Sequence, residues 1–195
     1  MIVYIEGVDG SGKSTFAKAI TTYLQDQGFD VVPKAEKAMV THPWRLDRVT
    51  KEHLISEITS RARSKQIHIV DRGELSDIIY RTFDFEKYSA LMSLKDYYSL
   101  YTFFKQNYVI IHCDSVRSEQ LMLERGEDNE VSITEHQKLR YLFNMIMPLF
   151  NAIKFDAALS IESPTYLEIK CMEIALLLSI KGAIKINRAQ PGKGD

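Results

Sequence analysis

A glycine-rich segment that begins at residue 7 constrains the fold of this 195-residue chain more than any other part of it. The residues from Gly7 to Ser14, GVDGSGKS, fit the pattern G-x-x-x-x-G-K-[ST]. The apolar run Ile2–Ile5, which favours a β-strand, comes directly before the segment, and a helical pattern follows it from Thr15. This order predicts a strand, a loop whose backbone N–H groups cradle a phosphate, and a helix N-terminus that adds partial positive charge.

The same segment predicts how a nucleoside triphosphate is held. We expect ATP and Mg²⁺ as cofactors, with Lys13 reaching the β- and γ-phosphates and the Ser14 hydroxyl ligating the metal. The residues expected to bind the cofactor are Gly7, Asp9, Gly10, Ser11, Gly12, Lys13, Ser14 and Thr15.

Strand and helix signals alternate along the rest of the chain. After the first strand, we expect strands over 30–34, 67–70, 109–114 and 156–162, and helices over 14–27, 43–64, 86–106, 116–124, 134–153 and 164–181. This alternation predicts the α/β class and a P-loop NTPase fold, with a five-stranded, mainly parallel sheet and helices on both faces. We expect a single domain over 1–188 with a short lid at about 125–132, followed by a flexible tail over 189–195.

Composition narrows the class of protein. The net charge of −1 argues against a strongly basic nucleic-acid binder, although it leaves room for a local cationic groove. Cys113 and Cys171 stand far apart among apolar neighbours, which predicts buried, reduced thiols and a cytoplasmic protein. A first strand at residue 2 leaves no room for a signal peptide, and the apolar run 174–180 is too short to span a membrane. The histidines do not form a metal-ligand pattern.

A second cluster of chemically suggestive residues follows the strand at 67–70. It reads DRGELSDIIY and begins at Asp71 and Arg72. A carboxylate at the end of a buried strand beside a P-loop typically holds Mg²⁺, and an adjacent arginine can grip a phosphate with two hydrogen bonds. We therefore expect Asp71 to share the metal with Ser14. The alternative is an aspartate that caps a helix and pairs with its neighbouring arginine.

These two motifs together resemble those of the thymidylate kinases, a family of P-loop nucleoside-monophosphate kinases. The family pattern E-G-x-D-G-S-G-K-[ST] stands at 6–14. The family pattern D-R-[YF]-x-x-S-x-x-A-Y-Q is similar to the second cluster, with Gly73 in place of the aromatic residue and with matches at Asp71, Arg72, Ser76 and Tyr80. The resemblance implies ATP-dependent phosphoryl transfer to a deoxynucleoside monophosphate such as dTMP, with Arg72 on the acceptor phosphate.

The resemblance also implies roles for residues outside these motifs. A family segment F-x-x-D-R looks like residues 44–48, which would place Trp44 on the acceptor base and Arg48 on its phosphate. Glu36 takes the place of an acidic residue after the second strand, and Arg125 matches the R-G element of the family's mobile lid. The implied catalytic residues are Lys13, Asp71, Arg72 and Arg125, and the implied substrate-binding residues are Glu36, Trp44, Arg48, Arg72, Ser76 and Tyr80. Relatives of this kind are commonly homodimers.

Other functions share parts of this pattern. The deoxynucleoside kinases have the same fold and a motif that ends in Ser-Asp, which Ser76 and Asp77 resemble; a nucleoside hydroxyl would need Glu36 or Asp71 as a base. A kinase of a nucleotide hydroxyl in DNA would need a cationic groove. A non-catalytic NTP-binding switch would need loops that sense the γ-phosphate, and the sequence has no guanine-reading N-K-x-D motif. Trp44 could also be a core residue at a helix start.

Overall fold

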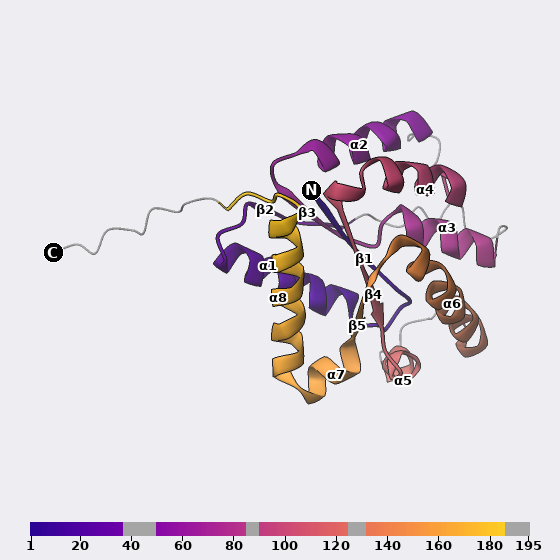
Figure 1. The fold of residues 1–195 in the computed structure, drawn as a ribbon. Coiled ribbons are helices and arrows are strands. Elements are labelled where there is room, and N and C mark those ends of the chain that lie inside the picture. Colours follow the sequence, from indigo (N-terminus) through magenta and orange to yellow (C-terminus); the bar gives the residue numbers. More distant parts are fainter. Residues whose placement is uncertain (37–49, 85–89, 125–131, 186–195) are drawn as a thin grey trace.

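The computed structural model describes residues 1–36, 50–84, 90–124 and 132–185 (Figure 1). Within these ranges five strands form one parallel sheet in the order β2-β3-β1-β4-β5. Their bounds are β1 (Ile2–Glu6), β2 (Val31–Glu36), β3 (Ile67–Asp71), β4 (Tyr108–Asp114) and β5 (Ile153–Asp156). The predicted α/β class and the five-stranded parallel sheet are confirmed.

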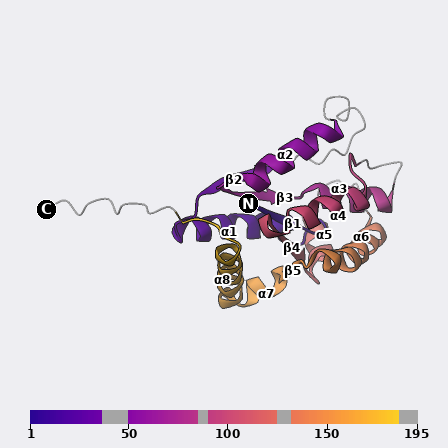
Figure 2. The ribbon, with the colours of Figure 1, turned by 45° about the horizontal axis from the view of Figure 1, so that its top comes forward.

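Helices cover both faces of this sheet. They are α1 (Lys13–Asp26), α2 (Lys51–Arg63), α3 (Glu74–Phe83), α4 (Leu94–Phe103), α5 (Ser118–Glu124), α6 (Ile133–Ile146), α7 (Ala157–Glu162) and α8 (Pro164–Ile180). Successive residues of β1 point to opposite faces, so that Val3 and Ile5 pack in the core with α1 and α8, whereas Ile2 and Tyr4 pack with α2, α3, α4 and α6. Figures 1 and 2 show these two helical layers on either side of the sheet.

The fifth strand differs from the prediction. We expected it over 156–162, but β5 covers Ile153–Asp156, and the following residues form α7. The reason is local, because the Asp156 carboxylate accepts hydrogen bonds from the backbone N–H groups of Ala158 and Leu159 and thereby caps a helix. The helix predicted over 134–153 also ends earlier: α6 stops at Ile146, a short 3₁₀ turn that contains Pro148 covers Met147–Phe150, and Asn151 follows with a φ of 51° before β5.

The aromatic zone predicted as a helix over 86–106 also begins later than expected. Ser93 caps α4, and the helix starts at Leu94. Tyr97 and Tyr101 are buried, whereas Tyr98 is half exposed. Of the regions predicted from the sequence, the start of the helix over 43–64, the lid residues 125–131 and the tail over 189–195 lie outside the described residues.

Two expectations from composition can be compared with the structure. Cys113 and Cys171 are both buried and are not joined to each other, which confirms that they are buried as predicted. Among the helices of the described ranges, none combines the length and the apolar character that crossing a bilayer requires.

Candidate functional site

Every strand of the sheet ends in an acidic residue: Glu6, Glu36, Asp71, Asp114 and Asp156. The carboxyl ends of parallel strands meet at one edge, which is where such sheets bind ligands. In the register of the sheet Glu36 lies beside Asp71, and Asp114 lies beside Asp156. Acidic residues are therefore concentrated at this edge, and the residues around them determine what the edge can bind.

The phosphate-binding loop joins β1 to α1 at this edge. The Lys13 side chain is buried, and its Nζ donates a hydrogen bond to the backbone oxygen of Val8 at 2.6 Å. Gly12 has a φ of 83°, and a Cβ there would lie 2.5 Å from the Cβ of Ala157 in α7. Only glycine fits at this position, because both the backbone conformation and the close packing exclude a side chain. The loop is therefore already folded into a tight turn at the N-terminus of α1.

The predicted metal-binding pair is brought together by the fold. The Ser14 hydroxyl donates a hydrogen bond to Oδ2 of Asp71 at 2.7 Å, and Asp71 is 8% exposed. A hydroxyl and a carboxylate are hard oxygen ligands of the kind that Mg²⁺ takes alongside water and phosphate oxygens. Gly73 starts α3 without a side-chain cap, so the helix-capping interpretation of Asp71 finds no support. The described residues contain no cluster of three or more histidine, cysteine or acidic side chains suited to a metal.

Arg72 takes an unusual backbone conformation beside this pair. Its φ is 60°, in the left-handed region, which costs a non-glycine residue about 1–2 kcal/mol. The conformation directs the guanidinium to an ion pair with Asp9 of the phosphate-binding loop and places it 5.7 Å from the ring centre of Tyr80. The Tyr80 hydroxyl donates to the same Asp9 carboxylate at 3.3 Å. Three predicted site residues from three different elements therefore meet at one point.

Glu6 organises the turn that carries Arg72. Its side chain is completely buried and accepts hydrogen bonds from the Gly73 N–H at 3.2 Å and from the Ser76 hydroxyl. Burial raises the pKa of Glu6 from 4.5 to about 7, and the nearby carboxylates of Glu74 and Asp77 contribute to the rise, against the hydrogen bonds from Ser76 and Gly73. The structure thus places Ser76, which we expected to contact substrate, below the surface with its hydroxyl on Glu6.

The Tyr4 ring explains why residue 73 is a glycine, where the thymidylate kinase pattern has an aromatic residue. A Cβ at position 73 would lie 2.4 Å from Cδ1 of the Tyr4 ring. That ring is fully buried and makes edge-to-face contacts with Tyr97 and Tyr108. The space beside the turn is therefore filled from β1, and a side chain at position 73 would collide with it.

His136 is a contact that the sequence did not indicate. It lies in α6, is 1% exposed, and its Nε2 donates to the backbone oxygen of Asp9 at 2.9 Å, since that oxygen can only accept. Burial lowers the pKa of His136, so the ring is neutral near pH 7. Through its backbone and side chain, Asp9 connects the phosphate-binding loop to both α6 and α3.

A second ion-paired group lies at the end of β4. Asp114 accepts from Nε of Arg140 at 2.6 Å and lies 3.1 Å from Nζ of Lys154. Burial acts to raise the pKa of Asp114, but the hydrogen bonds and charges of these two cations outweigh it and hold the pKa at about 2. Arg117, which lies just before α5, forms an exposed ion pair with Glu162 at 2.7 Å.

Several residues that the sequence predicted at the site are not placed there by the described part of the structure. Trp44, Arg48 and Arg125 lie outside the described residues, and Glu36 is described only as a backbone position at the end of β2. The exposed Thr15 lies in the first turn of α1, beside Ser14. Glu6, Tyr4 and His136 were missed. An acidic residue that ends an otherwise apolar strand is a signal that could have identified Glu6, whereas no sequence motif marks His136.

The fold is shared with solved structures of low sequence identity. The YorR protein of Bacillus subtilis, solved in complex with phosphorylated GDP, is 15% identical, with 95% of this chain and 100% of that chain covered and a TM-score of 0.63. The deoxyadenosine kinase of M. mycoides, solved with the products dCMP and dCDP, is 16% identical, with 91% and 100% covered and a TM-score of 0.52. No protein-family model and no curated protein matches the sequence. The similarity therefore concerns the P-loop kinase fold.

Proposed function

We propose that the chain transfers the γ-phosphoryl group of ATP to a nucleoside monophosphate, with dTMP or a related deoxynucleotide as the acceptor. The observation that carries the proposal is the 2.7 Å hydrogen bond between Ser14 and Asp71. It joins the hydroxyl of the phosphate-binding loop to the carboxylate at the end of β3, next to an arginine that the backbone holds in a strained conformation. Strain of this kind is concentrated at functional sites.

On the donor side, the loop amides and Lys13 bind the ATP phosphates. Lys13 would exchange its hydrogen bond with the Val8 carbonyl for a phosphate oxygen, which costs little because one acceptor replaces another. Ser14 and Asp71 would hold Mg²⁺, which neutralises charge on the phosphate oxygens when bound. Arg125 of the proposed lid would add a further positive charge over the transferred group.

On the acceptor side, Arg72 is the proposed clamp for the monophosphate. A phosphate dianion would compete with Asp9 for the guanidinium, and Tyr80 would support the arginine from its ring face. Trp44 and Arg48 are the proposed contacts to the acceptor base and phosphate. Since an acceptor phosphate is already ionised near neutral pH, the reaction needs positioning and charge neutralisation rather than a strong base.

A second candidate is transfer to the hydroxyl of a deoxynucleoside. One observation favours it: Glu36 lies beside Asp71 in the sheet register, which places a second acidic residue at the same edge. Because Asp71 accepts from Ser14, Glu36 would be the base. The deoxyadenosine kinase among the structures of the same fold is consistent with this alternative. A nucleotide hydroxyl in DNA remains a third acceptor to test, and a non-catalytic NTP-binding switch is the least favoured function.

The test is ADP release with Mg-ATP across a panel of nucleoside monophosphates and their parent nucleosides, ribo and deoxy. Stimulation by dTMP or a close relative supports the leading proposal, stimulation by nucleosides alone supports the second, and silence on the whole panel contradicts both.

Arg72→Ala should then raise the acceptor KM or lower kcat by about 10²-fold. Arg81→Ala is the matched control, because Arg81 lies in α3, the helix that follows Arg72, and its guanidinium donates to the Ala90 carbonyl at the surface. Unchanged acceptor kinetics in Arg72→Ala would remove Arg72 from this role.

A further inference from the structure

Asp9 is held from two sides by different parts of the fold. Its carboxylate forms the ion pair with Arg72 and accepts from the Tyr80 hydroxyl. Its backbone oxygen accepts from Nε2 of His136 in α6 at 2.9 Å. The Asp9 side chain is 48% exposed, and an ion pair with such exposure does not by itself fix the position of its partners. What holds the Asp9 peptide therefore decides where the carboxylate, and with it the Arg72 guanidinium, can lie.

His136 is fixed in place by the start of α6. The helix begins with a reciprocal cap, in which the Ser132 hydroxyl accepts from the Glu135 N–H and the Glu135 carboxylate accepts from the Ser132 N–H. Leu139 and Phe143, which follow on the same side of the helix as His136, are buried in the core. Because α6 is capped at its start and packed along this side, it holds the imidazole against the phosphate-binding loop.

The hydrogen-bonding groups of His136 explain the contact better than its shape does. Burial lowers the pKa of the ring, which is neutral near pH 7 and carries one N–H, and Nε2 uses it toward the Asp9 oxygen. The other nitrogen, Nδ1, is buried, and no partner for it lies in the described part of the chain. A leucine would fill similar space without burying a bare acceptor, so packing alone does not favour a histidine here. The donor at Nε2 is therefore the property that distinguishes this residue.

The next residue of the loop, Gly10, rests on the neighbouring helix. It has a φ of 72°, and a Cβ there would lie 2.4 Å from the backbone oxygen of Ser118, the first residue of α5. Helices α5 and α6 are themselves joined by a hydrogen bond from Nε2 of Gln137 to the Glu119 carboxylate at 3.1 Å. The peptide between Asp9 and Gly10 therefore rests on two helices that contact each other.

We propose that His136 is a positioning residue for Arg72 and acts through the peptide between Asp9 and Gly10. This role rests on the proposed function, in which Arg72 clamps the acceptor phosphate. Arg72 has a left-handed backbone conformation, which a non-glycine residue keeps only where its surroundings determine it. If the Asp9 peptide loses the hydrogen bond from His136, the carboxylate that holds the guanidinium is free to shift. The clamp is then no longer preformed for the acceptor.

The first experiment measures kinetics with the acceptor that the panel of monophosphates and nucleosides identifies. His136→Leu removes the donor at similar volume and should lower kcat/KM for the acceptor about tenfold, the effect of one neutral hydrogen bond. His136→Gln should recover most of this loss, because its amide can donate to the same oxygen. His136→Asn, whose amide reaches only as far as Nδ1, is a second loss variant and should resemble His136→Leu. An unchanged kcat/KM in both loss variants, or no recovery in His136→Gln, would overturn the proposal.

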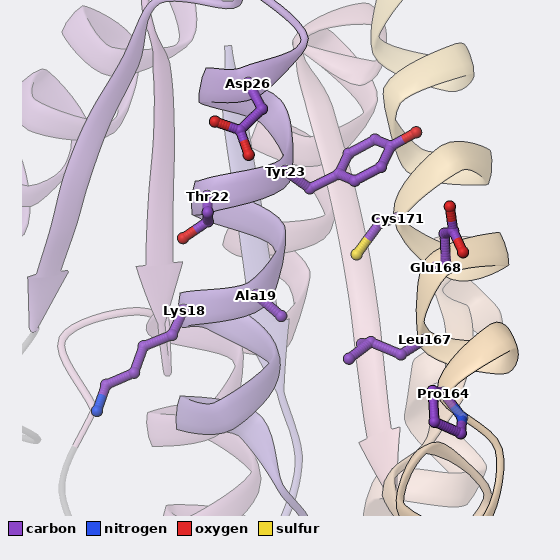
Figure 3. A pocket seen from close by; sticks show the side chains of 9 residues that line it. All are labelled: Lys18, Ala19, Thr22, Tyr23, Asp26, Pro164, Leu167, Glu168 and Cys171. Atoms are coloured by element: carbon purple, nitrogen blue, oxygen red, sulfur yellow. The ribbon is translucent and has the colours of Figure 1, made fainter.

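A variant on the other side of the sheet separates positioning from a general loss of stability. Helices α1 and α8 cover the face opposite α6, and a pocket of about 570 Å³ lies between them. Figure 3 shows Leu167 pointing from α8 toward α1 in this pocket. Leu167→Ala should lower the urea midpoint without touching Asp9 or Arg72, and its acceptor kcat/KM should stay within about twofold of the unmodified chain. A fall as large as that of His136→Leu would mean that lost stability alone explains the effect, which overturns the proposal.

The second experiment combines His136→Leu with Arg72→Ala. If His136 acts through Arg72, its substitution should change the acceptor kcat/KM by less than about twofold once the guanidinium is gone. Urea unfolding, followed by circular dichroism, shows that each protein is folded at the start of the assay. An equal loss from His136→Leu with and without Arg72 would mean that the histidine acts elsewhere, and it would overturn the proposal.

A third measurement needs no turnover. In proton–nitrogen NMR spectra of the arginine side chains, the Nε–H signal of Arg72 is identified by its absence in Arg72→Ala. This signal should move in His136→Leu and stay in place in His136→Gln and Leu167→Ala. A signal that does not respond to His136→Leu overturns the proposal with any acceptor. Silence on the whole acceptor panel, together with a signal that does respond, contradicts the proposed kinase function and supports the positioning of Arg72 by His136.

Discussion

The buried carboxyl group of Glu6 should make the folded protein less stable as the pH rises. Its pKa is raised to about 7 in the folded state, mainly by burial, from an ordinary value of 4.5. Above pH 4.5 the unfolded chain releases this proton while the folded chain retains it, so the folded state binds more protons. The free energy of unfolding attributable to Glu6 is therefore fully present below pH 4.5 and is lost up to about pH 7. Between about pH 5 and pH 8 the loss amounts to roughly 2–3 kcal/mol.

Glu6→Gln removes this titration while preserving the shape of the side chain. The glutamine carbonyl can accept the Gly73 N–H, and its amide can donate to the Ser76 oxygen. Other groups titrate in the same range with the opposite sign, since burial lowers the pKa of the N-terminal amine to about 6 and that of His112 to about 4. These contributions cancel when the variant and the unmodified chain are compared at equal pH.

Urea unfolding, followed by circular dichroism at several pH values from about 5 to about 8, measures this difference. We expect the variant to gain stability relative to the unmodified chain as the pH rises, reaching an advantage of roughly 2–3 kcal/mol near pH 8 over the value at pH 5. Glu168→Gln makes the same chemical change at an exposed position of α8 and is the matched control for the substitution itself. A difference for Glu6→Gln that is flat or falls with pH would refute the reasoning.

Three further substitutions test the rest of the site. Lys13→Ala should abolish turnover in the kinase assay while circular dichroism shows a folded chain, and full turnover would contradict the assignment of the phosphate-binding loop. Asp71→Asn should lower kcat by ~10²–10³ with little change in urea stability, since it removes one charge from the proposed metal pair. Gly73→Ala should lower the free energy of unfolding in urea by about 1–3 kcal/mol, because the added Cβ meets the Tyr4 ring. Combining it with Tyr4→Leu should relieve part of that loss. If the double variant loses the sum of the two single losses, the collision is excluded.

The parts of the fold that the sequence predicted are those fixed by local patterns. The strand, loop and helix around Lys13 follow from apolar runs, glycine positions and a helix start that lie within a few residues of one another. Strand β5 was misplaced because it has only four residues, and its last residue, Asp156, serves as the cap of the next helix. The apolar residues that follow Asp156 favour a strand by composition, but the capping hydrogen bonds of Asp156 start a helix there.

Some contacts at the site could also be predicted from the sequence, and others could not. The proximity of Ser14 and Asp71 could be expected, since Ser14 lies in the first turn of the helix that the loop after β1 leads into, and Asp71 ends the neighbouring parallel strand β3. The contacts of Asp9 with Arg72 and His136 join residues that are far apart in the sequence, and their geometry depends on how α3 and α6 pack. No sequence motif indicates that Asp9, Arg72 and His136 contact one another.

The strand order also determines when the sheet can form. Strand β1 is central, and its Ile2 aligns with His68 on one side and with Tyr108 on the other. Of the strands of this sheet, β1 is synthesised before the others and must wait longest for both neighbours, because its second edge stays open until β4 has emerged. Such distant pairing slows folding and leaves an apolar edge exposed in nascent chains. The same strand that supports the phosphate-binding loop is thus the one on which chaperone binding during translation should be concentrated.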